Sequence, residues 1–318
     1  MSVDLESGRG EQRQALQEKP GAARDGVSPA VRRWLPIIPV ALLLVVYGVT
    51  MAPSLSWQHH GADGGDLATA VALGGVPHPP GFPTYLLLGE AFVRLPWRDP
   101  AWRLNLLSAV SAALAAGCTA AAASLVLGRS FPPSASVPLA ALAAGLSLGL
   151  APLLWGQALI TEVYATAAFF AALVVLLALG GGPAWALGLA WGLGLGAHPT
   201  LVFLAPLALQ PALGGNERGR RLRWLAAVGL PALAVVALLY GPLLVARGGA
   251  WSPWADLSTW EGWWSLVSAR PYRGYVLALP VAAWPRRLLA WAGLLVRQFT
   301  PLGALLAGLG WAALWRER

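Results

Sequence analysis

The residues with the clearest capacity for chemistry are three carboxylates and two histidines. Asp63 and Asp66 lie three residues apart in an Asp-Gly-Gly-Asp sequence, Glu162 begins an apolar helical run, and His78 and His198 each precede a proline. A carboxylate at membrane depth is costly unless it is paired or hydrated, so such residues commonly mark functional sites. One carboxylate of this set could act as a general base whose pKa its neighbours adjust.

These residues also have structural interpretations. Asp66 could cap the helix that follows, because aspartate is a common helix start. Glu162 could lie at the headgroup boundary, where water or arginine satisfies it. The prolines after His78 fix φ and remove donors, which predicts a stiff extended connector that holds His78, or simply a rigid turn into the next helix. The neighbouring His59-His60 pair matches no closed metal-ligand spacing, so we assign no metal site, and a divalent-metal requirement stays open.

The composition indicates a membrane protein. Of the 318 residues, 57% are hydrophobic and 11% are charged, whereas a soluble domain carries roughly a quarter charged residues. Apolar stretches recur near the length that crosses a hydrocarbon core of about 30 Å. The net charge is +8, but the basic residues punctuate the ends of apolar runs and form no dense patch, so we exclude nucleic acid as a partner.

The chain divides into a tail and one membrane domain. The first 33 residues are polar and of mixed charge, which predicts a disordered cytoplasmic tail. Residues 34–318 predict an all-α polytopic membrane domain with about eight transmembrane helices. The expected spans are 34–51, 101–127, 136–154, 157–179, 184–209 (broken in two at His198-Pro199), 225–245 and 288–315.

Two loops should lie outside the membrane on the same face. Residues 52–100 form the first outer loop, with interfacial helices, and residues 247–285, rich in Trp, Tyr and Pro, form the second. The basic loop 216–223 marks the cytoplasmic side, and alternating the spans places both termini there. Most tryptophans fit an interfacial belt, but their density at 251–264 could also form a surface for a lipid chain or sugar.

Four motifs in this order resemble a known family. They are Asp63-Gly-Gly-Asp66-Leu67, His78-Pro-Pro-Gly-Phe-Pro-Thr-Tyr85, Arg103-Leu-Asn105-Leu-Leu-Ser108 and Glu162-Val-Tyr164. This set resembles the bacterial family related to protein O-mannosyltransferases, long catalogued as a domain of unknown function, within the GT-C superfamily of polytopic glycosyltransferases. The resemblance extends from about residue 34 to Tyr272 and Tyr275.

The resemblance implies a GT-C-like bundle in the bacterial inner membrane, surrounded by membrane lipids. A mannose-like hexose would move from a polyprenyl-phosphate donor to a hydroxyl of a protein or glycan acceptor at the outer face. Asp63 matches the family's catalytic aspartate and would deprotonate the acceptor, while Asp66 stands where the family more often has glutamate. The substrate-binding positions would be His78, Tyr85, Arg103, Asn105, Glu162, Tyr164, His198 and Tyr272, with arginine suited to the donor phosphate.

Two other functions remain open from the sequence. A transporter or lipid flippase would bind its substrate near mid-membrane between broken helices and would carry inverted repeats. No such repeat is visible, and the ionisable residues collect near one face. A non-catalytic GT-C-like assembly subunit would use the fold as a scaffold. The presence of Asp63 and Glu162 argues against that function.

Overall fold

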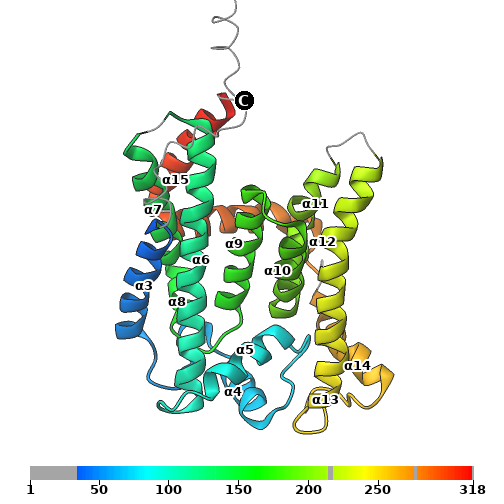
Figure 1. The fold of residues 1–318 in the computed structure, drawn as a ribbon. Coiled ribbons are helices and arrows are strands. Elements are labelled where there is room, and N and C mark those ends of the chain that lie inside the picture. The colour runs from blue at the N-terminus through cyan, green and yellow to red at the C-terminus, as the bar shows by residue number, and fades with distance from the viewer. Residues whose placement is uncertain (1–33, 133, 214–217, 276–277, 317–318) are drawn as a thin grey trace, which may run out of the picture.

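The computed structural model describes residues 34–132, 134–213, 218–275 and 278–316, and every regular element in these ranges is a helix (Figure 1). The tail predicted for residues 1–33 lies outside the described residues. The α-helices are α3 (Ile37–Thr50), α4 (Gly64–Leu73), α5 (Pro83–Val93), α6 (Pro100–Ser130), α7 (Ser136–Gly149), α8 (Pro152–Ala158), α9 (Tyr164–Gly180), α10 (Ala184–Ala197), α11 (Ala205–Leu213), α12 (Arg218–Leu238), α13 (Leu244–Arg247), α14 (Trp260–Val267) and α15 (Trp284–Arg316). Short helical turns are η1 (Gln58–His60), η2 (Pro199–Leu204), η3 (Leu239–Leu243), η4 (Arg270–Tyr275) and η5 (Val281–Ala283).

Several helices have the length and composition of membrane spans. Three described segments qualify alone, Pro100–Ser130, Arg218–Arg247 and Val281–Arg316, and α7 with α8 makes a fourth if this pair, bent by 63°, is one broken span. Helices α3, α9 and α10 and the segment Pro199–Gln210 are apolar but shorter. The membrane-protein class is therefore supported, whereas the expected number of eight spans is not confirmed.

Small residues let the long helices pack closely. Helix α6 begins at Asp99, whose Oδ1 accepts a hydrogen bond from the Trp102 amide at 3.0 Å, and it packs against α3, α7 and α9. A Cβ at Gly117 would lie 2.8 Å from the Pro36 carbonyl oxygen, and one at Gly145 would lie 2.6 Å from that of Ala116. Glycine at such positions permits the close backbone approach typical of membrane helices.

The bundle has two distinct ends. In Figure 1 the end of α6, the start of α7, the facing ends of α11 and α12 and the C-terminal end of α15 lie at the top, whereas α4, α5, α13 and α14 lie at the bottom. We call the bottom the loop end. Arg129 and Arg218, which we expected on the same side of the membrane, thus lie at the end opposite the two loops that carry the candidate site residues. Which end faces the cytoplasm stays a prediction.

A buried arginine joins the two loops at this end. Arg247, at the end of α13, is 7% exposed and forms an ion pair with Glu90 of α5. Its Nε donates to the Gly75 carbonyl at 2.9 Å, just after α4. The amide of Val76 donates to the Trp251 carbonyl at 2.7 Å, so the second loop is fixed directly onto the first.

Candidate active site

Asp66 anchors a histidine. It lies in the first turn of α4, where its Oδ2 accepts a hydrogen bond from the His78 backbone amide at 2.8 Å and lies 2.7 Å from His78 Nδ1. Its Oδ1 accepts a hydrogen bond from Trp254 Nε1 at 3.0 Å. The helix-cap interpretation is therefore wrong, because the Asp66 carboxylate bonds outside α4.

The segment after His78 is a turn. The Gly81 amide donates to the His78 carbonyl at 2.9 Å, and both Gly81 (φ 88°) and Phe82 (φ 41°) adopt left-handed backbone conformations. The extended connector was thus the wrong prediction and the rigid turn the right one. The turn packs the His78 ring edge-on against Phe82, with 5.0 Å between the ring centroids.

His78 is directed at the second aspartate. With Nδ1 engaged by Asp66, the Nε2 atom lies 3.7 Å from Oδ2 of Asp63, an ion-pair distance. The Asp63 side chain is 44% exposed, while that of His78 is 11% exposed. Asp63 is therefore the more accessible group of the pair, and His78 lies behind it.

Hydrogen bonds and neighbouring charges together outweigh burial in setting the pKa values of this pair. Burial by itself would lower the pKa of His78, but the hydrogen bond with Asp66 and the charges of Asp63, Asp66 and Glu162 outweigh it, so the pKa of His78 is raised. Burial conversely tends to raise the pKa of Asp66, and its hydrogen bonds with His78 and Trp254 overcome this and lower it. Both shifts favour an ionised Asp66 next to a protonated His78.

Glu162 lies buried beside Asp63, in the turn between α8 and α9. It is 1% exposed, and neither carboxylate oxygen has a hydrogen-bond partner of ordinary geometry within the described residues. Burial, together with the Asp63 charge, raises the pKa of Glu162 to about 7, although the amides of Val163 and Asp63 and the charge of His78 offset part of the effect. The carboxyl is consequently poised to exchange a proton near neutral pH.

Aromatic residues surround the carboxylates. The His198 ring, at the end of α10, stacks on Phe82 with centroids 5.9 Å apart and lies 5.5 Å from Tyr164. Tyr85 is fully buried in α5, where burial and the Glu162 charge raise its pKa. Burial and the charges of Asp63 and Asp66 raise the pKa of Tyr272 in the second loop. The structure thus brings two expected residues, His198 and Tyr164, into ring contact at the site, whereas Tyr85 and Tyr272 are linked to the carboxylates only through these electrostatic effects.

Arg103 and Asn105 instead bond to the backbone. The three guanidinium nitrogens of Arg103 donate to the carbonyls of Val93, Trp97 and Arg98 at 2.5–2.7 Å. Asn105 Nδ2 donates to the Ala52 and Ser54 carbonyls, and its Oδ1 accepts from Thr161 Oγ1 at 2.7 Å, next to Glu162. These contacts position the loops, and the predicted substrate contacts of both residues remain untested.

Trp254 and Phe82 belong to the site, although neither was among the site residues predicted from the sequence. The density of tryptophans at 251–264 indicated a surface without selecting one residue. Phe82 lies inside the His-Pro motif, so its position was visible but its packing role was not.

The part of the chain that resembles known proteins contains most residues of this site. Residues 63–211 match the model of the Protein O-mannosyl-transferase TMEM260 N-terminal domain. The match supports an O-mannosyltransferase-related family. The chain is also 33% identical to Protein O-mannosyl-transferase TMEM260 of Mus musculus over 138 residues, which are 43% of this chain but only 18% of the mouse protein. No solved structure matches the chain.

Proposed function

We propose that the chain is a membrane glycosyltransferase that moves a mannose-like hexose from a polyprenyl-phosphate donor to a hydroxyl of a protein or glycan. The observation that carries the proposal is the accessible Asp63 beside His78 and Glu162 at one end of an apolar bundle. The similarity to an O-mannosyl-transferase supports the sugar and the acceptor hydroxyl. The lipid-phosphate donor rests on the resemblance of the motifs.

Asp63 acts as the general base of the transfer. Its carboxylate takes the proton of the acceptor hydroxyl while the acceptor oxygen bonds to the anomeric carbon of the sugar. The bond from that carbon to the phosphate oxygen breaks, and the lipid phosphate leaves with the electron pair. Because Asp63 is the more exposed group, an acceptor can reach it from the loop end.

His78 supplies positive charge where the phosphate leaves. Arg103 already donates to three backbone carbonyls, and Arg247 already contacts Glu90 and Gly75. The protonated His78, oriented by Asp66, is the cation directed toward Asp63. A fixed charge near the leaving oxygen stabilises the transition state more than the ground state.

The setting of this reaction is the outer face of a bacterial inner membrane. The shorter apolar helices α3, α9 and α10 and the segment Pro199–Gln210 complete a GT-C-like arrangement of eight spans, with the loop end outside and both termini in the cytoplasm. The location of the ionisable cluster at one end argues against a transporter, whose site would lie near mid-membrane.

Transfer assays with the full chain test the proposal. The purified protein in lipid vesicles is incubated with polyprenyl-phosphate mannose and a hydroxyl-containing peptide, and released polyprenyl phosphate and mannosylated peptide are measured. Asp63→Asn should abolish both products. Asp256→Asn is the matched control, because Asp256 bonds locally to Ser258 in the second loop. Full transfer by the Asp63→Asn protein would overturn the assignment of the base.

A further inference from the structure

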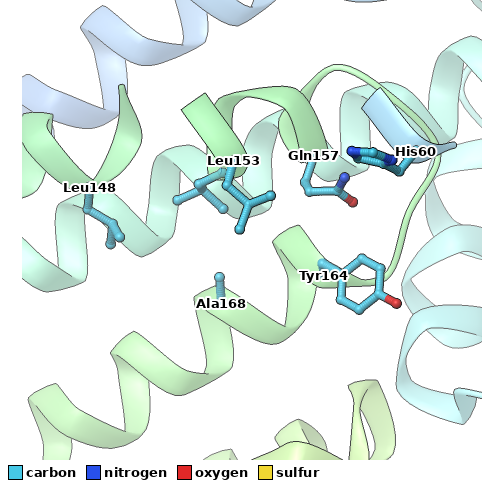
Figure 2. Close-up of a pocket in the computed structure, with 7 residues that line it drawn as sticks. His60, Leu148, Leu153, Gln157, Tyr164 and Ala168 are labelled. Atoms are coloured by element: carbon cyan, nitrogen blue, oxygen red, sulfur yellow. The ribbon is translucent and has the colours of Figure 1, made fainter. Parts of the chain in front are cut away.

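An apolar pocket of about 480 Å³ opens between α7, α8 and α9, next to the candidate active site (Figure 2). Leu148, Leu153, Leu154 and Ala168 form its apolar part, and His60, Gln157 and Tyr164 lie together at its other end. Its volume falls within the range of about 300–1,000 Å³ typical of small-molecule sites. The pocket therefore has an apolar body and one polar end.

A second, smaller cavity continues from the polar end. It measures about 210 Å³ and shares His60, Leu153 and Gln157 with the apolar pocket. Its lining also includes His59, Pro152, Gly156 and Gln298 of α15. We call His59, His60, Gln157 and Gln298 the polar mouth. Together the two cavities could accommodate an amphiphile, with its hydrocarbon chain in the apolar pocket and its head group in the smaller cavity.

Gln157 of the polar mouth lacks a partner that a ligand could provide. The residue is 7% exposed, and its Nε2 donates to the His59 carbonyl at 2.9 Å. Its Oε1 is buried and has no hydrogen-bond partner within the described residues, and Figure 2 shows it directed toward the side of Tyr164. A buried acceptor left unpaired is destabilising, so this oxygen indicates a missing donor.

The two histidines of the mouth have strained backbones. His59 (φ 54°) and His60 (φ 67°) both adopt the left-handed region, which is uncommon for non-glycine residues and clusters at functional sites. The His59 ring packs directly on Gly156, where an added Cβ would lie 3.1 Å from Nδ1. The local fold therefore places both histidines, which are exposed, at the cavity beside Gln157.

The chemistry of the mouth selects a neutral head group. Neither cavity is lined by an arginine or lysine among the residues that the structure describes. The unpaired group is an acceptor, and an ionised phosphate offers only acceptors. A hydroxyl group, in contrast, can donate to Gln157 Oε1 and also bond to an imidazole.

We propose that these cavities bind a neutral lipid with a hydroxylated head. The hydrocarbon chain occupies the apolar pocket, and a head hydroxyl donates to Gln157 Oε1 between His59 and His60. Tyr164 forms a shared wall, since it lines the pocket and its ring lies 5.5 Å from that of His198. The head thus lies beside the candidate active site. This site is separate from the phosphate of the proposed donor and does not depend on the transfer reaction.

Photolabelling of the full chain in phospholipid vesicles tests the site. The probe is an alkyl glucoside with a diazirine in its chain, and the competitors are the unlabelled glucoside and an alkyl phosphate of equal length. We expect labelled peptides from α7, α8 and α9, and competition by the glucoside at concentrations at least about tenfold below the alkyl phosphate, as one or two added hydrogen bonds imply. Equal competition by both, or by neither, would overturn the proposal.

Two variants and a control complete the experiment. Ala168→Trp fills the apolar pocket and should abolish the labelling, whereas Leu139→Trp, at a position of α7 that is 66% exposed and outside the pocket, should leave it unchanged. Gln157→Leu removes the acceptor and should erase the preference for the glucoside over the phosphate. If Ala168→Trp fails to fold, as judged by size-exclusion chromatography, Gln157→Leu decides. A preference that survives Gln157→Leu contradicts the proposed head contact.

Discussion

Asp66 Oδ2 lies 2.7 Å from His78 Nδ1 and also accepts the His78 backbone amide, so one carboxylate oxygen fixes both the ring and the main chain of the histidine. This double contact sets the direction of the opposite ring nitrogen, which lies 3.7 Å from Asp63 Oδ2. The two aspartates of the Asp-Gly-Gly-Asp motif therefore have different roles. Asp66 orients His78, and Asp63 remains accessible.

Asp66→Asn should separate these roles. Loss of the carboxylate should lower transfer by about tenfold to a hundredfold, the range found for carboxylates that orient metal-bound histidines. The substitution also removes a cause of the raised pKa of His78. The protonated imidazole is then lost at lower pH, so the alkaline limb of the kcat/KM profile should move toward lower pH. Asp256→Asn should leave the profile unchanged. An unmoved alkaline limb in Asp66→Asn would contradict the role of this pair.

Glu162→Gln tests the buried carboxyl. Its pKa is raised from 4.5 to about 7, so the folded protein binds more protons than the unfolded chain between these values, and stability falls as pH rises through this window. Above pH 7 the wild type carries this full penalty, which the neutral glutamine lacks. The variant should therefore gain stability relative to the wild type by up to about 3 kcal/mol between pH 4 and pH 8, at 1.36 kcal/mol for each pKa unit.

Apparent melting temperatures at pH 4 and pH 8 measure this effect in the same vesicles. Glu261→Gln is the control, because it makes the same substitution at a carboxylate that is 81% exposed. The exposed variant should show the same melting-temperature difference from the wild type at both pH values. A Glu162→Gln protein whose difference from the wild type is likewise independent of pH would show that Glu162 keeps an ordinary pKa.

The sequence predicted the all-helical membrane class and the location of the site carboxylates on one face, for physical reasons. Apolar runs of spanning length and basic residues at their ends place Asp63 and Glu162 on one face, although 99 positions separate them in the chain. The turn after His78 was foreseeable because glycine and proline restrict the backbone strongly. These signals are local, or they follow from the membrane, so the sequence alone could reveal them.

Other features depend on packing and could not be predicted. Trp254 bonds to Asp66 across 188 positions, and a tryptophan near a membrane surface has many other uses. The family resemblance implied that Arg103 lines the substrate site, where arginine suits a phosphate, yet in the folded chain its guanidinium donates to backbone carbonyls. Hydropathy likewise cannot decide whether short helices such as α9 cross the membrane.

Arg103→Gln distinguishes the two roles of that arginine. If the guanidinium serves the carbonyls of Val93, Trp97 and Arg98, its loss should destabilise the protein by about 1–3 kcal/mol, while the KM for the donor stays unchanged in the folded fraction. Thermal unfolding and donor titration measure the two quantities. Arg297→Gln is the control, because Arg297 bonds only within its own helix among the contacts described. A KM raised severalfold without loss of stability would instead assign Arg103 to the donor phosphate.

Trp254→Phe asks whether the second loop tunes the reaction. The substitution keeps an aromatic ring beside His78 but removes the Nε1–H that Asp66 Oδ1 accepts at 3.0 Å. With one hydrogen bond fewer, the pKa of Asp66 should rise toward its ordinary value, and Asp66 should hold His78 less firmly. We expect kcat/KM to fall about fivefold, the equivalent of one hydrogen bond of about 1 kcal/mol. The matched control is Trp260→Phe in α14, whose ring is 73% exposed and stacks on Trp263. Equal losses in the two variants would indicate that the loop acts only through its docking, since only Trp254 touches the aspartate that orients the histidine.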